Sequence, residues 1–170
     1  MGITKDGNET EKMVLGLVSI ARMNTDNSAQ GKKKGDLIAH IGPRRYFIEV
    51  KKKTMNQSRP YKYIATVAKD PDTDYWVVIP AHISMKMAYK RKGQHAINAF
   101  ECMSLGLATA KKFTKFRCTP ESLESRIKSA IEESQSEENK KWKEFAKEIR
   151  KDVEMLAERH QANAAKLLSE

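Results

Sequence analysis

Two carboxylates and a lysine lie on neighbouring apolar segments in the first third of the chain. Asp36 precedes one short apolar run, Glu49 lies near the end of the next, and Lys51 follows two residues later. Carboxylate oxygens are ligands that Mg²⁺ prefers, and a cation beside them can face a phosphate group. Residues 35–53 therefore predict a metal-dependent site that acts on phosphate esters.

Hydrolysis of a phosphodiester needs a metal at the scissile phosphate, an attacking hydroxide and neutralisation of the charge on the phosphate oxygens. Asp36 and Glu49 can supply metal ligands, and the backbone carbonyl of Val50 can complete the shell. Residues two apart on a strand face the same side, so Glu49 and Lys51 project together. Lys51 would orient or deprotonate the water and offset phosphate charge. An unpaired pair of carboxylates would be costly without a cation, which is a second reason to expect a metal.

The two apolar runs have the composition of a β-hairpin. Leu37–Ile41 and residues 46–50 are short and rich in β-branched residues, and the sequence GPRR separates them. We expect both carboxylates to lie at adjacent strand ends on one edge of a sheet.

Helices are expected on both sides of this hairpin. The first begins at Asn8 or Thr10 and continues to about Met23. The spacing of apolar residues predicts a second helix over residues 56–68, with Pro60 in its first turn.

The second half of the chain alternates strand and helix signals. Residues 75–80 form a continuous apolar run, typical of a strand buried in a sheet centre. Residues 83–89 fit a short helix, whereas residues 96–107 fit either a strand or a helix. A further helix begins at Thr119, with a proline and a glutamate in its first turn, and is interrupted near residue 134.

The last segment is a long amphipathic helix. It can pack on its own domain, or pair with a second copy of the chain along a helical seam. The elements together predict an α/β sandwich around a small mixed sheet, with a core over residues 1–118 and a helical extension over residues 119–170 within the same domain. The apolar face of the last helix consists of Trp142, Phe145, Ile149, Val153, Leu156, Ala164 and Leu167.

The charge of the chain is strongly positive and unevenly distributed. The formal net charge is +10, and residues 31–53 contain eight lysines and arginines against only Asp36 and Glu49. Such a basic surround suits an enzyme that acts on nucleic acid. A solvated lysine-rich loop is the alternative interpretation of the charge alone.

The remaining composition favours a soluble protein of the cytoplasm. No run approaches the roughly 18–20 apolar residues of a membrane span, and the first twelve residues lack the apolar core of a signal peptide. Cys102 and Cys118 fit neither a zinc spacing nor a disulfide framework, so we expect both to be reduced and buried.

These features resemble the PD-(D/E)XK nuclease superfamily. The resemblance covers roughly residues 8–82 and rests on Gly35-Asp36 and Glu49-Val50-Lys51, after an N-terminal helix with glutamates and before a helix and an apolar strand. The thirteen-residue step from Asp36 to Glu49 is similar to the step in archaeal Holliday-junction resolvases and several small restriction enzymes. Gly35 stands where the family usually has a proline.

The resemblance implies a restriction-endonuclease-like αβα fold with Asp36, Glu49 and Lys51 as catalytic residues. It also implies Mg²⁺ as the cofactor, with Mn²⁺ able to substitute, held by Asp36, Glu49 and the Val50 carbonyl. The glutamate of the family's first helix, which can bind a metal, matches Glu9 or Glu11.

Residues that could read or hold double-stranded DNA form three groups: the motif surround, the segment directly after it, and a basic cluster after residue 90. Solvated surface is the competing interpretation for each of them. They are Lys33, Lys34, Arg44, Arg45, Lys53, Asn56, Gln57, Arg59, Arg91, Lys92, Gln94 and His95.

We therefore expect a Mg²⁺-dependent DNA endonuclease, and within that class a small homodimeric type II restriction enzyme whose helical segments form the dimer. A structure-selective Holliday-junction resolvase and a homing endonuclease are the alternatives within the same chemistry. A basic nucleic-acid-binding protein with a coiled-coil tail is the non-enzymatic alternative.

Overall fold

The structure is a computed structural model that describes most of the chain. The described ranges are residues 5–25, 35–58, 62–92 and 102–169. Within these ranges, the side chains of residues 5–8, 56–58, 90–92, 102–104 and 153 are not described.

A mixed six-stranded sheet forms the centre of the molecule, with strand order β1-β2-β3-β5-β6-β8. Strands β3 and β5 are parallel, and the other neighbouring pairs in this sheet are antiparallel. The strands are β1 (Ala21–Met23), β2 (Leu37–Ile41), β3 (Arg44–Lys51), β5 (Ala65–Lys69), β6 (Trp76–Pro80) and β8 (Arg117–Cys118).

Helices and a second, two-stranded sheet surround this centre. The small sheet pairs β4 (Thr54–Ser58) with β7 (Cys102–Leu107) in antiparallel fashion. The helices are α1 (Lys5–Leu17), α2 (Ala81–Lys92), η3 (Lys111–Phe116), η4 (Pro120–Ser122), α4 (Leu123–Gln135) and α5 (Glu137–Ser169).

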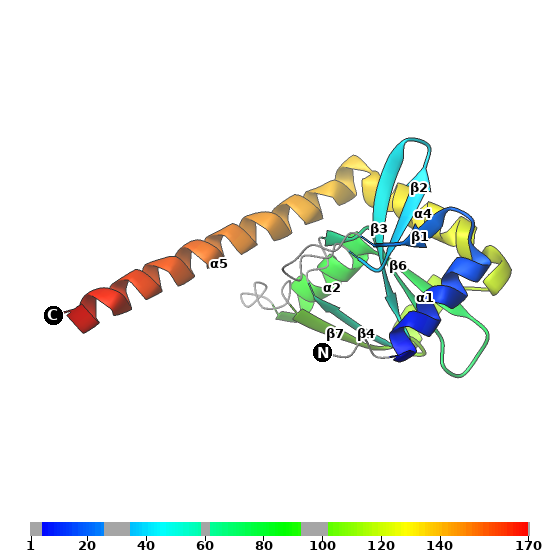
Figure 1. The fold of residues 1–170 in the computed structure, drawn as a ribbon, viewed down its shortest axis with the longest axis horizontal. Helices are drawn as coiled ribbons and strands as arrows, with labels where there is room; N and C mark the ends of the chain where they lie inside the picture. The colour runs from blue at the N-terminus through cyan, green and yellow to red at the C-terminus, as the bar shows by residue number, and fades with distance from the viewer. Residues whose placement is uncertain (1–4, 26–34, 59–61, 93–101, 170) are drawn as a thin grey trace.

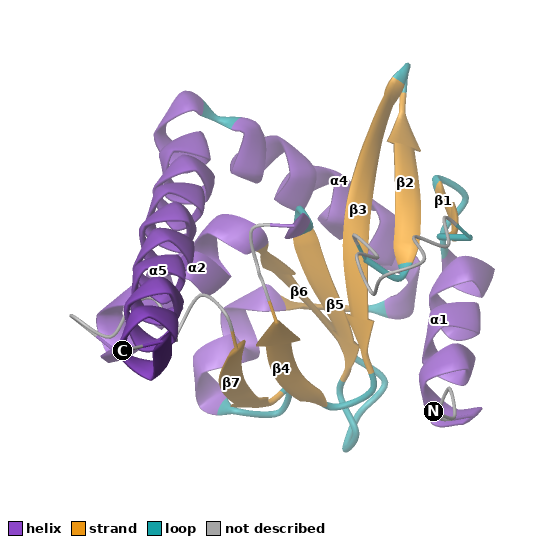
Figure 2. Ribbon diagram, turned by 60° about the vertical axis from the view of Figure 1, so that its left-hand side comes forward, coloured by secondary structure: helices purple, strands orange, loops and turns teal. Residues whose placement is uncertain are grey.

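Each face of the central sheet has its own hydrophobic cluster because strand side chains alternate between the two faces. On one face, Ile48 and Val50 of β3 pack with residues of α1 and α4 such as Val14 and Ile127. On the other, Ala68 and Val77 pack with residues of β4, α2, β7 and η3 and with Ala146 of α5. Figure 2 shows the strands between α2 and α5 on the left and α1 on the right. The fold is therefore a mixed α/β layered arrangement.

The hairpin prediction is confirmed, and so are several of the other elements. Strands β2 and β3 pair with Leu37 opposite Ile48, and all five residues of β6 are buried, although β6 lies between β5 and the two-residue edge strand β8 and not at the sheet centre. Helices α2, α4 and α5 lie where the sequence predicts helices, and α4 is integral to the core because Leu123 and Ile127 are fully buried. The ambiguous segment before Leu107 ends in a strand, β7.

Two helix predictions are wrong. Residues 56–68 are not a helix, since β4 ends at Ser58 and β5 begins at Ala65. Strand β5 is buried on both faces, so its apolar residues do not alternate with polar ones. In such a continuous apolar run the spacing of a helix and that of a buried strand look alike. The first helix ends at Leu17, and residues 21–23 form the edge strand β1. Met13 and Leu17 of this helix are 48% and 40% exposed.

Helix α5 begins on the domain and then leaves it (Figure 1). Ala146 is fully buried, and Trp142, Phe145 and Ile149 are partly buried against the same cluster. Beyond Lys151 every residue with a described side chain is exposed. None of the helices in the described part of the chain is both long enough and apolar enough to cross a membrane.

Candidate functional site

The turn into β2 fixes the position of Asp36. The backbone N–H of Asp36 donates to the carbonyl of Ile48 at 2.9 Å, and the Val50 N–H donates to Oδ2 of Asp36 at 2.9 Å. Asp36 directly precedes the first β2–β3 pair, Leu37 with Ile48, and its two bonds are to the residues on either side of Glu49. The hairpin therefore brings together the two carboxylates that the sequence singles out.

Gly35 and Asn24 support this turn. Gly35 has φ +127°, and a Cβ atom there would lie 2.9 Å from the Ile48 carbonyl oxygen. The buried amide of Asn24 donates from Nδ2 to the Gly35 carbonyl at 2.9 Å, and the Asn24 N–H donates to the Asp36 carbonyl at 2.9 Å. Sequence reasoning missed Asn24, because it lies in a polar segment with no periodic pattern.

Glu49 and Lys51 project together from β3, as predicted. The Lys51 ammonium lies 2.6 Å from Oε1 of Glu49, and the two side chains are 26% and 19% exposed respectively. Both point to the face opposite Ile48 and Val50, because strand residues alternate. The register places the fully buried Thr66 beside Glu49 on β5. The pair is thus partly desolvated and still accessible from solvent.

Both carboxylates affect the pKa of Tyr63. Its side chain is buried, and burial raises the pKa of the phenol above its usual value. The negative charges of Glu49 and Asp36 raise this pKa further. Tyr63 is therefore a neutral hydroxyl near the site.

The residues present suit Mg²⁺ better than a metal that needs a full protein shell. Within the described ranges, no three His, Cys, Asp or Glu side chains come close enough to hold an ion together. Mg²⁺ is commonly held by one or two carboxylates, with water and substrate phosphate completing its shell. Asp36, Glu49 and the Val50 carbonyl fit that description.

Neither Glu9 nor Glu11 joins Asp36 and Glu49 in such a group. Helix α1 packs through Val14 on the face of the hairpin that carries Val50, whereas Glu49 points to the other face. Glu9 is exposed and Glu11 is half-buried. The choice between the two as a third carboxylate therefore has no support from their placement.

The predicted DNA contacts are only partly placed. Arg44 and Arg45 are exposed at the hairpin turn, five and four residues before Glu49 and so roughly 13–17 Å from it along the strand. Lys53 is exposed in the turn after β3. The backbones of Asn56 and Gln57 in β4 and of Arg91 and Lys92 in α2 are described without their side chains. Lys33, Lys34, Arg59, Gln94 and His95 lie outside the described residues.

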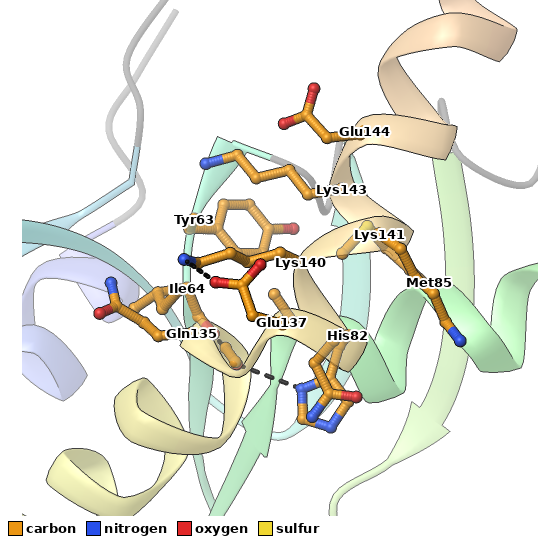
Figure 3. Close-up of a pocket in the computed structure, with 13 residues that line it drawn as sticks. Tyr63, Ile64, His82, Met85, Gln135, Glu137, Lys140, Lys141, Lys143 and Glu144 are labelled. Carbon is orange, nitrogen blue, oxygen red and sulfur yellow. Dashed lines mark hydrogen bonds and ion pairs between the residues drawn. The ribbon is translucent and has the colours of Figure 1, made fainter.

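A pocket of about 620 Å³ lies where α4 meets α5 (Figure 3). We call it the α4–α5 pocket. Its wall nearest the hairpin is Tyr63 and Ile64, and Ile64 donates its N–H to the Phe47 carbonyl at 2.8 Å, two residues before Glu49. The other lining residues are Ala81, His82, Met85, Ser134, Gln135, Glu137, Asn139, Lys140, Lys141, Lys143 and Glu144.

His82 is held in the wall of this pocket as a neutral imidazole. Its Nδ1 lies 3.2 Å from Oγ of Ser134, and that hydroxyl donates to the Ile64 carbonyl at 3.3 Å. Nδ1 therefore carries the proton and donates to Ser134. Burial lowers the pKa of His82, and the charge of Lys86 lowers it further, whereas Glu133 and Glu138 act in the opposite direction.

Acidification is expected to destabilise the protein through His82. The folded-state pKa lies below the ordinary value of 6.5, so the folded state binds fewer protons than the unfolded state below that pH. The stabilising contribution is complete above pH 6.5 and is lost as the pH falls toward the folded-state pKa. Urea denaturation at pH 7.5 and pH 5.5 should show a larger loss of unfolding free energy for wild type than for His82→Asn. Equal losses in the two proteins would contradict this assignment.

Comparisons of the chain with protein families, with curated proteins and with solved structures give no match.

Proposed function

We propose that this chain is a Mg²⁺-dependent DNA endonuclease that hydrolyses phosphodiester bonds. The observation that carries the proposal is the pair of hydrogen bonds that join Asp36 to Ile48 and Val50, on either side of Glu49, while Lys51 contacts Glu49 on the same face of β3. Two neighbouring carboxylates, beside a lysine and partly open to solvent, are an arrangement suited to a divalent cation and a phosphate.

The chain's own residues divide the work. Asp36, Glu49 and the Val50 carbonyl would hold Mg²⁺, which when bound supplies Lewis-acid polarisation of the phosphate and a lowered pKa for water. The Val50 N–H fixes the orientation of the Asp36 carboxylate through its bond to Oδ2. Lys51, no longer needed to neutralise Glu49, would offset the negative charge that develops on the phosphate oxygens.

Some elements of the fold agree with the resemblance to the PD-(D/E)XK superfamily and its restriction-endonuclease-like αβα fold, and others differ from it. The hairpin, the mixed sheet and the buried strand after the motif agree with what the resemblance implies. The helix expected between the motif and that strand is replaced by β4 and β5, and β4 pairs with a strand from much later in the chain. The chemistry of the motif is therefore a stronger support for the proposal than the surrounding topology.

The direct test of the proposal is cleavage of supercoiled plasmid DNA. Wild-type protein with Mg²⁺, or with Mn²⁺ as its substitute, should nick or cut the plasmid, and EDTA should abolish this. Lys51→Ala should lower the rate by about 10²-fold or more, since it removes a charge that acts on the transition state. Lys52→Ala, an exposed neighbour, is the matched control and should retain activity. Binding without cleavage under all conditions would instead support a non-catalytic basic nucleic-acid-binding protein.

The products of the same assay distinguish the enzyme classes. We propose a small homodimeric type II restriction enzyme, which should give discrete fragments from plasmids of different sequence. Selective cutting of synthetic four-way junctions would favour a Holliday-junction resolvase. A single rare site in long DNA would favour a homing endonuclease.

We propose that α5 forms the dimer. Its distal part would be marginal as an isolated helix in water, and Leu156 and Leu167 are 50% and 75% exposed on it. Light scattering after size exclusion should give the mass of a dimer for wild type and of a monomer for the double variant Leu156→Glu with Leu167→Glu. Lys151→Glu, exposed on the same helix and already charged in wild type, is the control. A wild-type monomer at tens of micromolar would contradict the proposal.

A further inference from the structure

The α4–α5 pocket lies close to β3, the strand that carries Glu49 and Lys51. Tyr63 and Ile64 form one of its walls, and Ala65 directly after them pairs with Ile48 on β3. The Ala81 N–H, at the start of α2, donates to the Ile64 carbonyl at 2.8 Å. A ligand in this pocket would therefore lie beside the strand that carries Glu49.

The interior of the pocket suits a flat, largely apolar group. Ile64, Ala81 and Met85 give it apolar walls, and Tyr63 adds an aromatic ring. His82 has a second ring nitrogen that, in the tautomer fixed by Ser134, can accept a hydrogen bond. The volume of about 620 Å³ lies within the range of about 300–1,000 Å³ that is usual for small-molecule sites.

The rim of the pocket suits an anion. Three lysines and two glutamates of α5 line it. Glu144 pairs with Lys147, outside the pocket, at 3.0 Å, and Glu137 pairs with Lys140 at 3.0 Å. Exposed pairs of this kind are weak, so a phosphate can replace Glu137 beside Lys140.

The lysine side chains of the rim do not all extend to the same side of the pocket. Figure 3 shows the Lys140 and Lys143 side chains extending toward the Tyr63 side of the pocket, whereas Lys141 extends the other way. The positive charge is thus gathered on the side of the pocket that faces the hairpin. On that side the hairpin adds Arg44, whose guanidinium lies 3.5 Å from Oε1 of the lining residue Gln135.

We propose that the α4–α5 pocket binds one unpaired nucleotide of the DNA strand, with its base against Ile64, Met85 and Tyr63 and its phosphate at Lys140 and Lys143. This inference deepens the proposed function and rests on DNA being the substrate. A pocket for a bare phosphate would need neither the apolar walls nor this volume. A nucleotide that is already unpaired enters such a pocket at a lower cost of unstacking and unpairing than a paired one.

The test uses two short duplexes that differ in one nucleotide. One contains a single bulged 2-aminopurine and the other carries the same base paired with thymine. Binding is measured with full-length protein in EDTA, so that no cleavage is required. We expect the bulged duplex to bind about tenfold more tightly, with a change in 2-aminopurine fluorescence that the paired duplex does not show.

Two single-charge variants locate the effect. Lys143→Gln should remove most of the preference for the bulged duplex. Lys151→Gln removes the same charge from an exposed position of the same helix outside the pocket and should retain the preference. Both sites are exposed, so neither change should affect folding.

Each outcome bears separately on the pocket and on the proposed function. Equal affinity for the two duplexes, or an unchanged preference in Lys143→Gln, would overturn the pocket assignment even if plasmid cleavage is observed. A preference that depends on Lys143 would support it even if no cleavage occurs. Absence of binding to either duplex would overturn both.

Discussion

Gly35→Ala is expected to destabilise the protein by about 3 kcal/mol or more and to abolish the proposed cleavage. A φ of +127° is a conformation that residues with a Cβ atom rarely adopt, and strain of this kind costs about 1–3 kcal/mol. The added Cβ would also lie 2.9 Å from the Ile48 carbonyl oxygen, a backbone atom that cannot rotate away. The turn must shift, and the adjacent Asp36 must shift with it.

A thermal melt and an activity assay measure the two effects. For a chain of this length, about 3 kcal/mol corresponds to a fall in Tm of roughly 6–12 °C. Gly16→Ala is the matched control, because Gly16 lies in α1 with no heavy atom within 4 Å of the added Cβ. That substitution should stabilise the protein by about 0.5–1 kcal/mol, the usual gain for alanine in a helix. A Gly35→Ala protein with wild-type Tm and activity would show that the turn has another conformation.

The part of the site that could be predicted from the sequence is the part that local pattern determines. The β2–β3 hairpin follows from two apolar runs and a turn sequence, and Asp36, directly before β2, is bonded to the two neighbours of Glu49 in β3. A one-residue slip would turn the buried Ile48 toward the opposite face, so the hydrophobic pattern fixes that register.

The elements that sequence reasoning missed depend on contacts distant in the chain. Strand β4 is short and polar, and it is a strand because it pairs with β7, so that Gln57 lies opposite Met103. The hydrogen bond from Asn24 to Gly35 joins residues eleven positions apart, and the sequence between them has no pattern. The α4–α5 pocket combines Tyr63, His82 and the first turns of α5, and no local spacing connects these segments.

Asp36→Asn and Glu49→Gln should each lower the rate of DNA cleavage by about 10³-fold or more. Each removes one of the two carboxylates that would hold Mg²⁺, and the Lewis-acid contribution of a bound metal is several kcal/mol. About 4 kcal/mol corresponds to a factor of about 10³ in rate. Asp72→Asn, on an exposed loop, is the matched control and should leave the rate unchanged.

The same two variants should fold as well as wild type. The amide oxygen of an asparagine at position 36 can still accept the Val50 N–H, so the turn keeps its hydrogen bond. Each substitution also removes the repulsion between the two neighbouring carboxylates, which in Glu49→Gln offsets the loss of the partly exposed ion pair with Lys51. An unchanged or slightly raised Tm is therefore expected, and a large fall in both would mean that the carboxylates serve the fold and not the chemistry.

Metal binding can be separated from catalysis in these proteins by thermal shift. A ligand that binds only the folded state stabilises it by RT ln(1 + [L]/Kd), so Mg²⁺ in large excess over Kd should raise the Tm of wild type. The increase should be absent from Asp36→Asn and Glu49→Gln and present in Asp72→Asn. If both variants fold normally but lose the response to Mg²⁺ and the cleavage activity, one cause explains all three results. That cause is a cation held between β2 and β3. A rise in Tm that survives both substitutions would place the metal elsewhere.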